Sequence, residues 1–306
     1  MNNLSKVARN AALATVMCLV SAIPGFAQEP VKPSTDFGLY LRGKFAEPSV
    51  LFAPDDSTKA RAADSFRLFY DRDDVSGNEI ISLSGSLFAQ FRNVHSTERP
   101  LKLSAYSFGV SLDQSTVNGA TARDTIIFHA GGSWLFQSDQ PVFWNSHYIS
   151  ANLGWITDRD FDLSVVTAKA RYTPRGQGFG FGAVPYGTGN FKFQITPALM
   201  AEYQNVVDAA GRADYAGAAE RFYLGTSLEF IGTFADGPLQ PVTLDAAYFA
   251  ATDLLGNAGD HQLFDVGLSW ALTDSGNLSV RAGYTKGSTP TRSETDKVSI
   301  GLGLSF

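Results

Sequence analysis

KVSIGLGLSF, residues 297–306, alternates two kinds of residue without interruption. Apolar residues take every second position from Val298 to Phe306, and serine or glycine stands between them. Successive side chains of a β-strand point to opposite faces, so the stretch predicts a strand with one wholly apolar face. A strand at the end of a chain gains little from such a face in water, whereas a strand that borders lipid requires it.

The same pattern recurs along the chain, with turn signals between the strand-like runs and almost no helical periodicity. Most runs are about ten residues long, which suits a tilted strand that crosses a bilayer. The predicted fold is all-β, a transmembrane antiparallel up-and-down β-barrel of about twelve strands. The predicted strands are 65–71, 79–92, 101–112, 125–136, 142–156, 161–172, 191–204, 221–231, 242–250, 262–272, 278–285 and 297–306.

Residues 37–45 also alternate, and two interpretations stay open for them: a further strand, or a segment inside the lumen. A thirteenth strand would conflict with the even number typical of such barrels. In that case the total would be fourteen, or one of the twelve runs would have to be lost.

Residues 1–27 have the pattern of a secretory signal peptide. Lys6 and Arg9 precede a short apolar run over 11–23, and Gly25-Phe26-Ala27 supplies small residues for cleavage. Residues 28–306 would then form the barrel domain, with 28–63 as an N-terminal segment and loop. The only cysteine, Cys18, lies in the apolar run, so the mature chain would have neither disulfides nor thiolate zinc ligands.

The end of the chain resembles the C-terminal signal of Gram-negative outer-membrane barrels. The positions that carry the resemblance are Ser299, Gly301, Leu304 and Phe306. The resemblance is to a broad class and to no specific family. It implies a location in the bacterial outer membrane, contact with outer-membrane lipid, and recognition by the barrel-assembly machinery.

A soluble β-sandwich or barrel would also show alternating strands. Two features favour the membrane barrel. One face of a strand is bulky along its whole length, as from Phe264 to Leu272, and aromatic residues gather near strand ends, as at Trp134, Trp155 and Trp270. A mean hydropathy of −0.05 is compatible with a membrane barrel, because its two faces average out. The formal net charge of −6 makes nucleic acid a poor partner.

An even number of strands with a periplasmic C-terminus predicts which links share a side. The tight links 138–141, 236–240 and 273–277 fall on the periplasmic side, and the longer links 113–123, 206–220 and 286–296 fall outside. The long link 173–190 is the exception, because it falls on the periplasmic side.

The face opposite the lipid predicts the function. Hydroxyl, amide and charged residues occupy it, with both signs present and bases somewhat ahead. Such charges either hydrate a pore or pair and plug it, and about twelve strands allow both. The candidate lumen-lining charges are Arg67, Arg92, Lys169, Arg171, Lys192, Glu202, Arg221, Glu229, Asp245, Asp265 and Arg281.

We expect a passive, porin-like channel or facilitator for small polar solutes, with no cofactor and no metal. The alternative is a closed barrel with a partner-binding, structural or polysaccharide-export role. A second alternative is a lipid-modifying hydrolase. His147 and Ser150 are three residues apart and should point to opposite sides of a strand. His129 shares its face with Thr125 and Ser133, which suits a hydrogen-bonded interior histidine.

Overall fold

The computed structural model describes residues 34–42, 66–73, 79–95, 100–118, 120–137, 144–176, 190–212, 215–217, 219–234, 237–256, 258–273, 278–290 and 292–304. None of these ranges contains a helix that is long and apolar enough to cross a membrane. They form the strands β1 (Ser34–Arg42), β2 (Phe66–Asp73), β3 (Glu79–Val94), β4 (Leu101–Val117), β5 (Ala120–Gln137), β6 (Trp144–Thr157), β7 (Ser164–Gly176), β8 (Phe191–Asp208), β9 (Glu220–Phe234), β10 (Val242–Asp253), β11 (His261–Ala271), β12 (Leu278–Thr289) and β13 (Arg292–Leu304).

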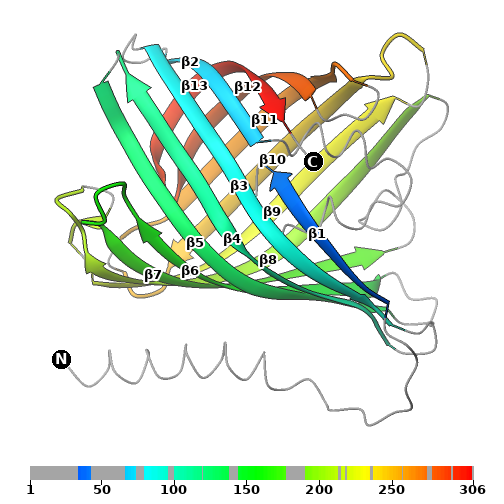
Figure 1. Ribbon diagram of the computed structural model, residues 1–306, viewed down its shortest axis with the longest axis horizontal. Helices are drawn as coiled ribbons and strands as arrows, with labels where there is room; N and C mark the ends of the chain where they lie inside the picture. Colours follow the sequence, from blue (N-terminus) through cyan, green and yellow to red (C-terminus); the bar gives the residue numbers. More distant parts are fainter. Residues whose placement is uncertain are drawn as a thin grey trace.

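Strands β2 to β13 pair antiparallel with their neighbours in chain order, and the last strand returns to the first (Figure 1). The pairing of β13 with β2 runs from Lys297 opposite Asp73 to Leu304 opposite Phe66. This pairing closes the sheet into a barrel, so the ladder of the ring has no free edge. The predicted antiparallel barrel of about twelve strands is therefore confirmed.

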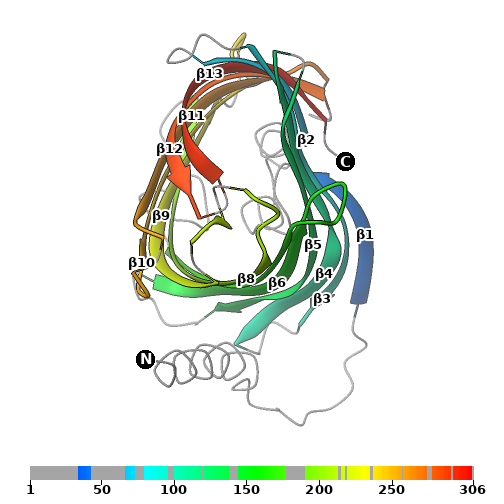
Figure 2. The same cartoon turned by 90° about the vertical axis from the view of Figure 1, so that its left-hand side faces the viewer.

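Strand β1 is a thirteenth strand outside the ring. It pairs with β3 from Ser34 opposite Val94 to Arg42 opposite Ser86, while β2 pairs with the other part of β3. The two strands thus share one edge of β3, and β1 lies at the outside of the ring in Figure 2. Of the two interpretations of 37–45, the strand is correct over its described part. The ring needs neither a fourteenth strand nor the loss of one.

The barrel has two rims, which we name by the end of β13. At the C-terminal rim β13 ends, and the strands that flank the predicted tight links 138–141, 236–240 and 273–277 end there too. The links that follow β3 and β7 lie at the C-terminal rim as well, and the far rim carries the links that follow β2, β4, β6, β8, β10 and β12. The topology thus groups the three tight links at one rim, as the sequence predicts. Residues 177–189 of the long link between β7 and β8 lie outside the described part of the chain.

Two predicted long links at the far rim are wrong. Residues 113–123 belong mostly to β4 and β5, with Gln114 opposite Asp124, and residues 286–296 belong mostly to β12 and β13, with Lys286 opposite Asp296. These strands continue with polar residues on both faces. The apolar alternation that marks a strand disappears there, although the backbone ladder continues. The predicted link 206–220 is confirmed, because β8 ends at Asp208 and β9 begins at Glu220.

The outer face of the ring is apolar and accessible. On β13, Val298, Ile300, Leu302 and Leu304 are each about half exposed, at 51%, 56%, 49% and 52%. Aromatic rings pair on the same face, as where Phe128 stacks on Trp155 at 5.5 Å between centroids. A continuous apolar surface of this kind is unfavourable in water and matches the hydrocarbon of a bilayer.

Candidate functional site

The candidate site is the inner face of the ring. Antiparallel partners share a face, so the register assigns every residue to one side. The predicted charges all fall on the side opposite the apolar surface. For example, Lys169 on β7 is the register partner of Glu202 on β8, and Glu202 is the register partner of Tyr223 on β9, so all three lie on one face. The residues so placed are Arg67, Arg92, Lys169, Arg171, Lys192, Glu202, Arg221, Glu229, Asp245, Asp265 and Arg281.

Two ion pairs join charges of β7 to charges of β8 and β9. The Lys169 ammonium lies 3.4 Å from a Glu202 carboxylate oxygen on β8. The Arg171 guanidinium donates to Glu229 on β9 at 2.9 Å, and both side chains are largely buried. Both pairs run along the wall, between strands that are one or two positions apart in the ring.

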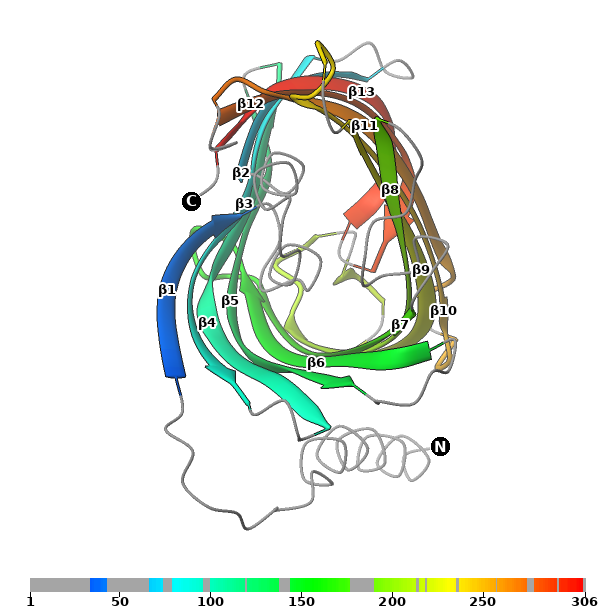
Figure 3. The same ribbon diagram turned by 90° about the vertical axis from the view of Figure 1, so that its right-hand side faces the viewer.

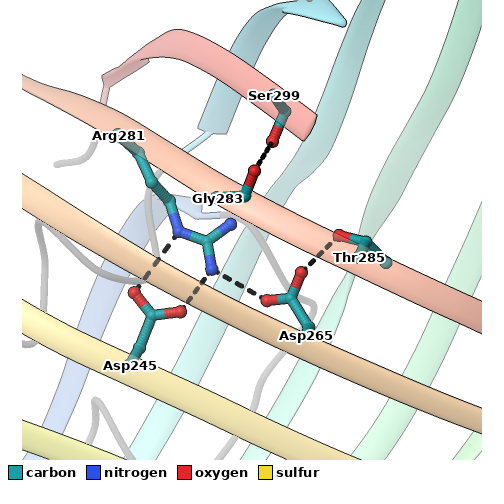
Figure 4. A network of polar contacts seen from close by, with 6 residues as sticks. All are labelled: Asp245, Asp265, Arg281, Gly283, Thr285 and Ser299. Carbon is teal, nitrogen blue, oxygen red and sulfur yellow. Dashed lines mark hydrogen bonds and ion pairs between the residues drawn. The ribbon is translucent and has the colours of Figure 1, made fainter. Parts of the chain in front are cut away.

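Arg281 is the centre of a larger network (Figure 4). It binds Asp245 on β10 through two nitrogens and Asp265 on β11 at 2.8 Å. The Thr285 hydroxyl donates to the second oxygen of Asp265 at 2.5 Å. A Cβ at Gly267 would overlap the guanidinium, so the glycine makes room for it. The structure thus brings three of the predicted charges together, Asp245, Asp265 and Arg281. The contributions of Thr285 and Gly267 to this network were not predicted.

The remaining predicted bases are Arg67, Arg92, Lys192 and Arg221. Arg67 lies over the Phe69 ring at 5.8 Å, and Arg221 lies over the Tyr215 ring at 5.7 Å. Arg92 and Lys192 stand within two residues of the C-terminal-rim ends of β3 and β8. Lys192 is exposed, and within the described residues neither it nor Arg92 makes an ion pair.

A row of neutral hydrogen bonds lines the wall from β3 to β5. Gln90 donates to the Ser107 hydroxyl at 2.9 Å, Ser86 and Ser111 are bonded at 2.6 Å, and Ser111 and His129 are bonded at 2.8 Å. His129 is therefore a hydrogen-bonded interior residue, as predicted, but its partner comes from the neighbouring strand. The alternating serines of β3 and β4 are the sequence signal that could have revealed this row.

The link between β8 and β9 folds inward at the far rim. Tyr215 is buried against Ile156, Leu163 and Val165, and the Arg212 and Arg221 guanidinium groups each lie 5.7 Å from its ring centroid. Arg212 also donates to the Asp124 carbonyl and the Thr125 hydroxyl, at 3.3 and 3.2 Å. In Figure 2 this link, drawn in yellow-green, lies within the ring. No local pattern in the sequence predicts these contacts.

A second element narrows the same rim. The turn between β12 and β13 leans into the ring, and the Gln204 amide of β8 donates to its Pro290 carbonyl at 3.5 Å (Figure 3). Ser288 bonds His261 at 3.0 Å. Gly287, with φ of 111° and a register shift beside it, allows the bend. The link between β8 and β9 and the turn between β12 and β13 thus both make inward contacts at the far rim.

The positions named for hydrolysis do not form a site. His147 lies on the outer face, where its Nδ1 and the Tyr172 hydroxyl are 2.8 Å apart, and Ser150 lies on the inner face. The two residues point to opposite sides, as the spacing predicts. Among the described residues, no three histidine, cysteine or acidic side chains gather as metal ligands.

Comparison with known proteins shows likeness to solved structures only. No protein-family model matches the chain, and no curated protein matches it. Similar structures include the KdgM porin in complex with disordered oligogalacturonate, at 10% identity and a TM-score of 0.37 over 79% of this chain and 99% of that one. The transport unit of the autotransporter AIDA-I from Escherichia coli has 10% identity and a TM-score of 0.37, over 96% and 97%. An anion-selective porin from Comamonas acidovorans has 8% identity and a TM-score of 0.35, over 89% and 100%.

Similarity at this level assigns no function to the chain. What the structure itself provides is a closed antiparallel ring, an accessible apolar exterior and a polar interior. Only closed barrels and helices satisfy every backbone group within lipid. Even-stranded antiparallel barrels of this design are the integral proteins of bacterial outer membranes. The chain is an integral outer-membrane β-barrel.

Proposed function

We propose that the protein is a passive channel for small polar solutes across the bacterial outer membrane. One observation carries the proposal: the closed ring of twelve strands turns a largely polar face inward, with charged side chains from most of its strands. A lining of hydroxyl, amide and charged groups solvates water and small solutes. Passage is diffusion through the lumen, with no chemical turnover and no cofactor.

The arrangement of the ion pairs supports an open lumen. Arg171 binds Glu229 two strands away, and Arg281 binds Asp265 and Asp245 one and two strands away. A barrel plugged by its own charges would pair them across the lumen. Here the described ion pairs join strands one or two positions apart, so they lie along the wall.

A closed barrel that binds a partner is the second candidate, and the far rim favours it. Tyr215 is buried in the inward-folded link, and the Gln204–Pro290 bond joins strands from different sides of the ring. A rim held permanently shut by these contacts would leave the outer loops as the functional surface. The Gln204–Pro290 hydrogen bond is long, at 3.5 Å, which suits a constriction better than a seal.

Swelling of liposomes that contain the refolded protein tests the proposal. We expect swelling in isotonic solutions of small neutral sugars, with a rate that falls steeply as the sugar grows. Rates that rise linearly with sugar concentration would show diffusion without saturation. A barrel that is folded, as judged by heat-modifiable migration, yet gives no swelling with any sugar would favour the closed barrel.

The route to the membrane is part of the same proposal. Residues 1–27 would direct export and be removed, and Ser299, Gly301, Leu304 and Phe306 would be recognised by the barrel-assembly machinery. Phe306→Ala should then lower the amount of assembled barrel in the outer membrane. The same variant should refold in detergent as well as the parent chain does. Equal assembly of both chains in cells would contradict this part of the proposal.

A further inference from the structure

The inner face is not evenly charged along the barrel axis. In the half of each ring strand that ends at the C-terminal rim, the described inward side chains include two acids, Glu229 and Asp245. The same halves carry six bases, which are Arg67, Arg92, Arg171, Arg175, Lys192 and Arg281. In the far-rim halves, the acids outnumber the bases among the described inward side chains. The acids are Asp113, Glu202, Asp253 and Asp265, and the bases are Lys169, Arg221 and Lys297.

Both acids of the basic half are already engaged by bases of that half. Glu229 accepts from Arg171 at 2.9 Å, and Asp245 accepts from Arg281. Among the described inward side chains, the wall near the C-terminal rim therefore keeps an excess of positive charge. Outside the ring, Asp36 of β1 lies opposite Arg92 in the register, but its side chain is exposed and makes no ion pair with Arg92 among the described residues.

Two of the bases are in a position to meet a solute. Lys192 is exposed and Arg92 is partly exposed, and each stands near the C-terminal-rim end of its strand. β8 is the fifth strand on from β3 in the ring of twelve, so the two side chains come from opposite walls. Arg175 is buried over the Tyr148 ring at 5.9 Å and contributes to the field without contacting the solute.

We propose that this basic half selects small anions, and the proposal rests on the channel function proposed above. Low-dielectric walls concentrate the field of wall charges inside a narrow aqueous lumen. Anions are enriched there and cations are repelled. The formal net charge of the whole chain is −6, which by itself would favour cations. If the channel prefers anions, the preference must therefore come from the bases near the C-terminal rim and not from the net charge of the chain.

The test is the reversal potential of the refolded full-length mature protein in a planar bilayer under a potassium chloride gradient. The parent channel should conduct and should pass chloride in preference to potassium. Lys192→Glu should lower the ratio of chloride to potassium permeability by about two-fold or more at low salt, because a charge change this close to the path acts through little screening. The shift should shrink as the salt concentration rises.

Arg159→Glu is the matched control. It changes the net charge by the same amount, but Arg159 lies exposed in the link between β6 and β7. It should leave the permeability ratio unchanged. Arg92→Gln is a second variant that removes one charge from the opposite wall, and it should shift the ratio in the same direction as Lys192→Glu but less.

The outcomes separate the two proposals. A folded barrel that never conducts would overturn the channel function. A barrel that conducts but prefers potassium would overturn the anion inference and leave the channel intact. Equal shifts for Lys192→Glu and Arg159→Glu would show that overall charge, and not the basic half, sets the selectivity, which also overturns the inference.

Discussion

Arg281 shows what a single charged side chain does on the inner wall. Its side chain is nearly fully buried, while the Asp245 and Asp265 side chains that it binds are 17% and 24% exposed. Removing the guanidinium would leave two carboxylates close together with no base between them. Removing one partner of a buried ion pair is far more costly than removing the whole pair.

Arg281→Gln should therefore lower the free energy of unfolding by on the order of 2 kcal/mol, since partial exposure of both carboxylates softens the cost. The measurement is urea unfolding of the barrel in detergent micelles, followed by tryptophan fluorescence. Lys169→Gln is the control, because its pair with Glu202 is 44% exposed on the lysine side and should contribute less than about 1 kcal/mol. Adding Asp245→Asn and Asp265→Asn to Arg281→Gln should restore most of the loss. Equal effects of Arg281→Gln and Lys169→Gln would contradict this account of the network.

At this scale the sequence reveals the face of a residue but not its partners. The period of two suffices to assign Lys169, Arg171 and Arg281 to one side of their strands. Ser111 with His129, and Thr285 with Asp265, depend on how neighbouring strands are aligned. That alignment is set by the turns and by packing around the whole ring, which no single strand encodes.

Among the elements, the link between β8 and β9 differs most from its sequence pattern. It is rich in alanine and glycine. It folds inward because Tyr215 packs against apolar side chains on the inner face, at the far-rim ends of β6 and β7. Arg212 then fixes it to β5 through Asp124 and Thr125. We infer that this element limits access at the far rim.

Tyr215→Ala should release the link. We expect a higher single-channel conductance and cleavage by trypsin at Arg212 that is faster by about ten-fold, because the loss of ring packing raises the population of the open link. Tyr215→Phe keeps the ring and should behave like the parent chain in both assays. An unchanged conductance in Tyr215→Ala, together with faster cleavage, would show that the link moves without limiting the path.

Strand β1 tests whether the ring is complete without it. Its register contacts are with β3 alone, and its Tyr40 ring stacks on Phe88 at 5.4 Å. Deletion of residues 34–42 should leave a barrel that folds and keeps heat-modifiable migration, with a loss of stability of about 1–3 kcal/mol from the lost packing and ladder contacts. A chain that no longer folds would show that β1 belongs to the closure of the barrel.

The sequence predicts the bounds of strands well where one face of the strand borders lipid. It predicts them poorly where a strand continues beyond the apolar outer surface. The starts and ends of β3, β6, β9 and β11 lie within a few residues of their predicted bounds, because apolar alternation marks them. β4, β5, β12 and β13 continue into polar ends that resemble loops. The backbone ladder stabilises these ends without any hydrophobic pattern.

For the whole molecule, the two faces of the sheet should respond oppositely to an added charge. Leu153 and Asn152 are neighbours on β6, with Leu153 59% exposed on the outer face and Asn152 on the inner face. Leu153→Arg should destabilise the barrel in lipid by about 2–4 kcal/mol if it lies near the bilayer midplane. Asn152→Arg should cost much less. Urea unfolding in phospholipid vesicles measures both variants, and a similar cost for the two would contradict the assignment of the faces.

The closed ring, the apolar exterior and the polar interior were all predictable at this scale, because each follows from alternation summed over twelve strands. The state of the far rim was not predictable, since it depends on the packing of Tyr215 against β6 and β7 and on the bond between Gln204 and Pro290. Contacts between residues so distant in sequence leave no periodic trace. The question they raise is whether the lumen conducts.

Single-channel recording of the refolded mature protein in a planar bilayer addresses that question most directly. The proposed function predicts stable, stepwise conductance that appears only with folded, heat-modifiable protein and increases in Tyr215→Ala. Consistent silence from protein that is folded and inserted, in the parent chain and in Tyr215→Ala alike, would contradict the channel and favour a closed barrel that acts through its outer surface.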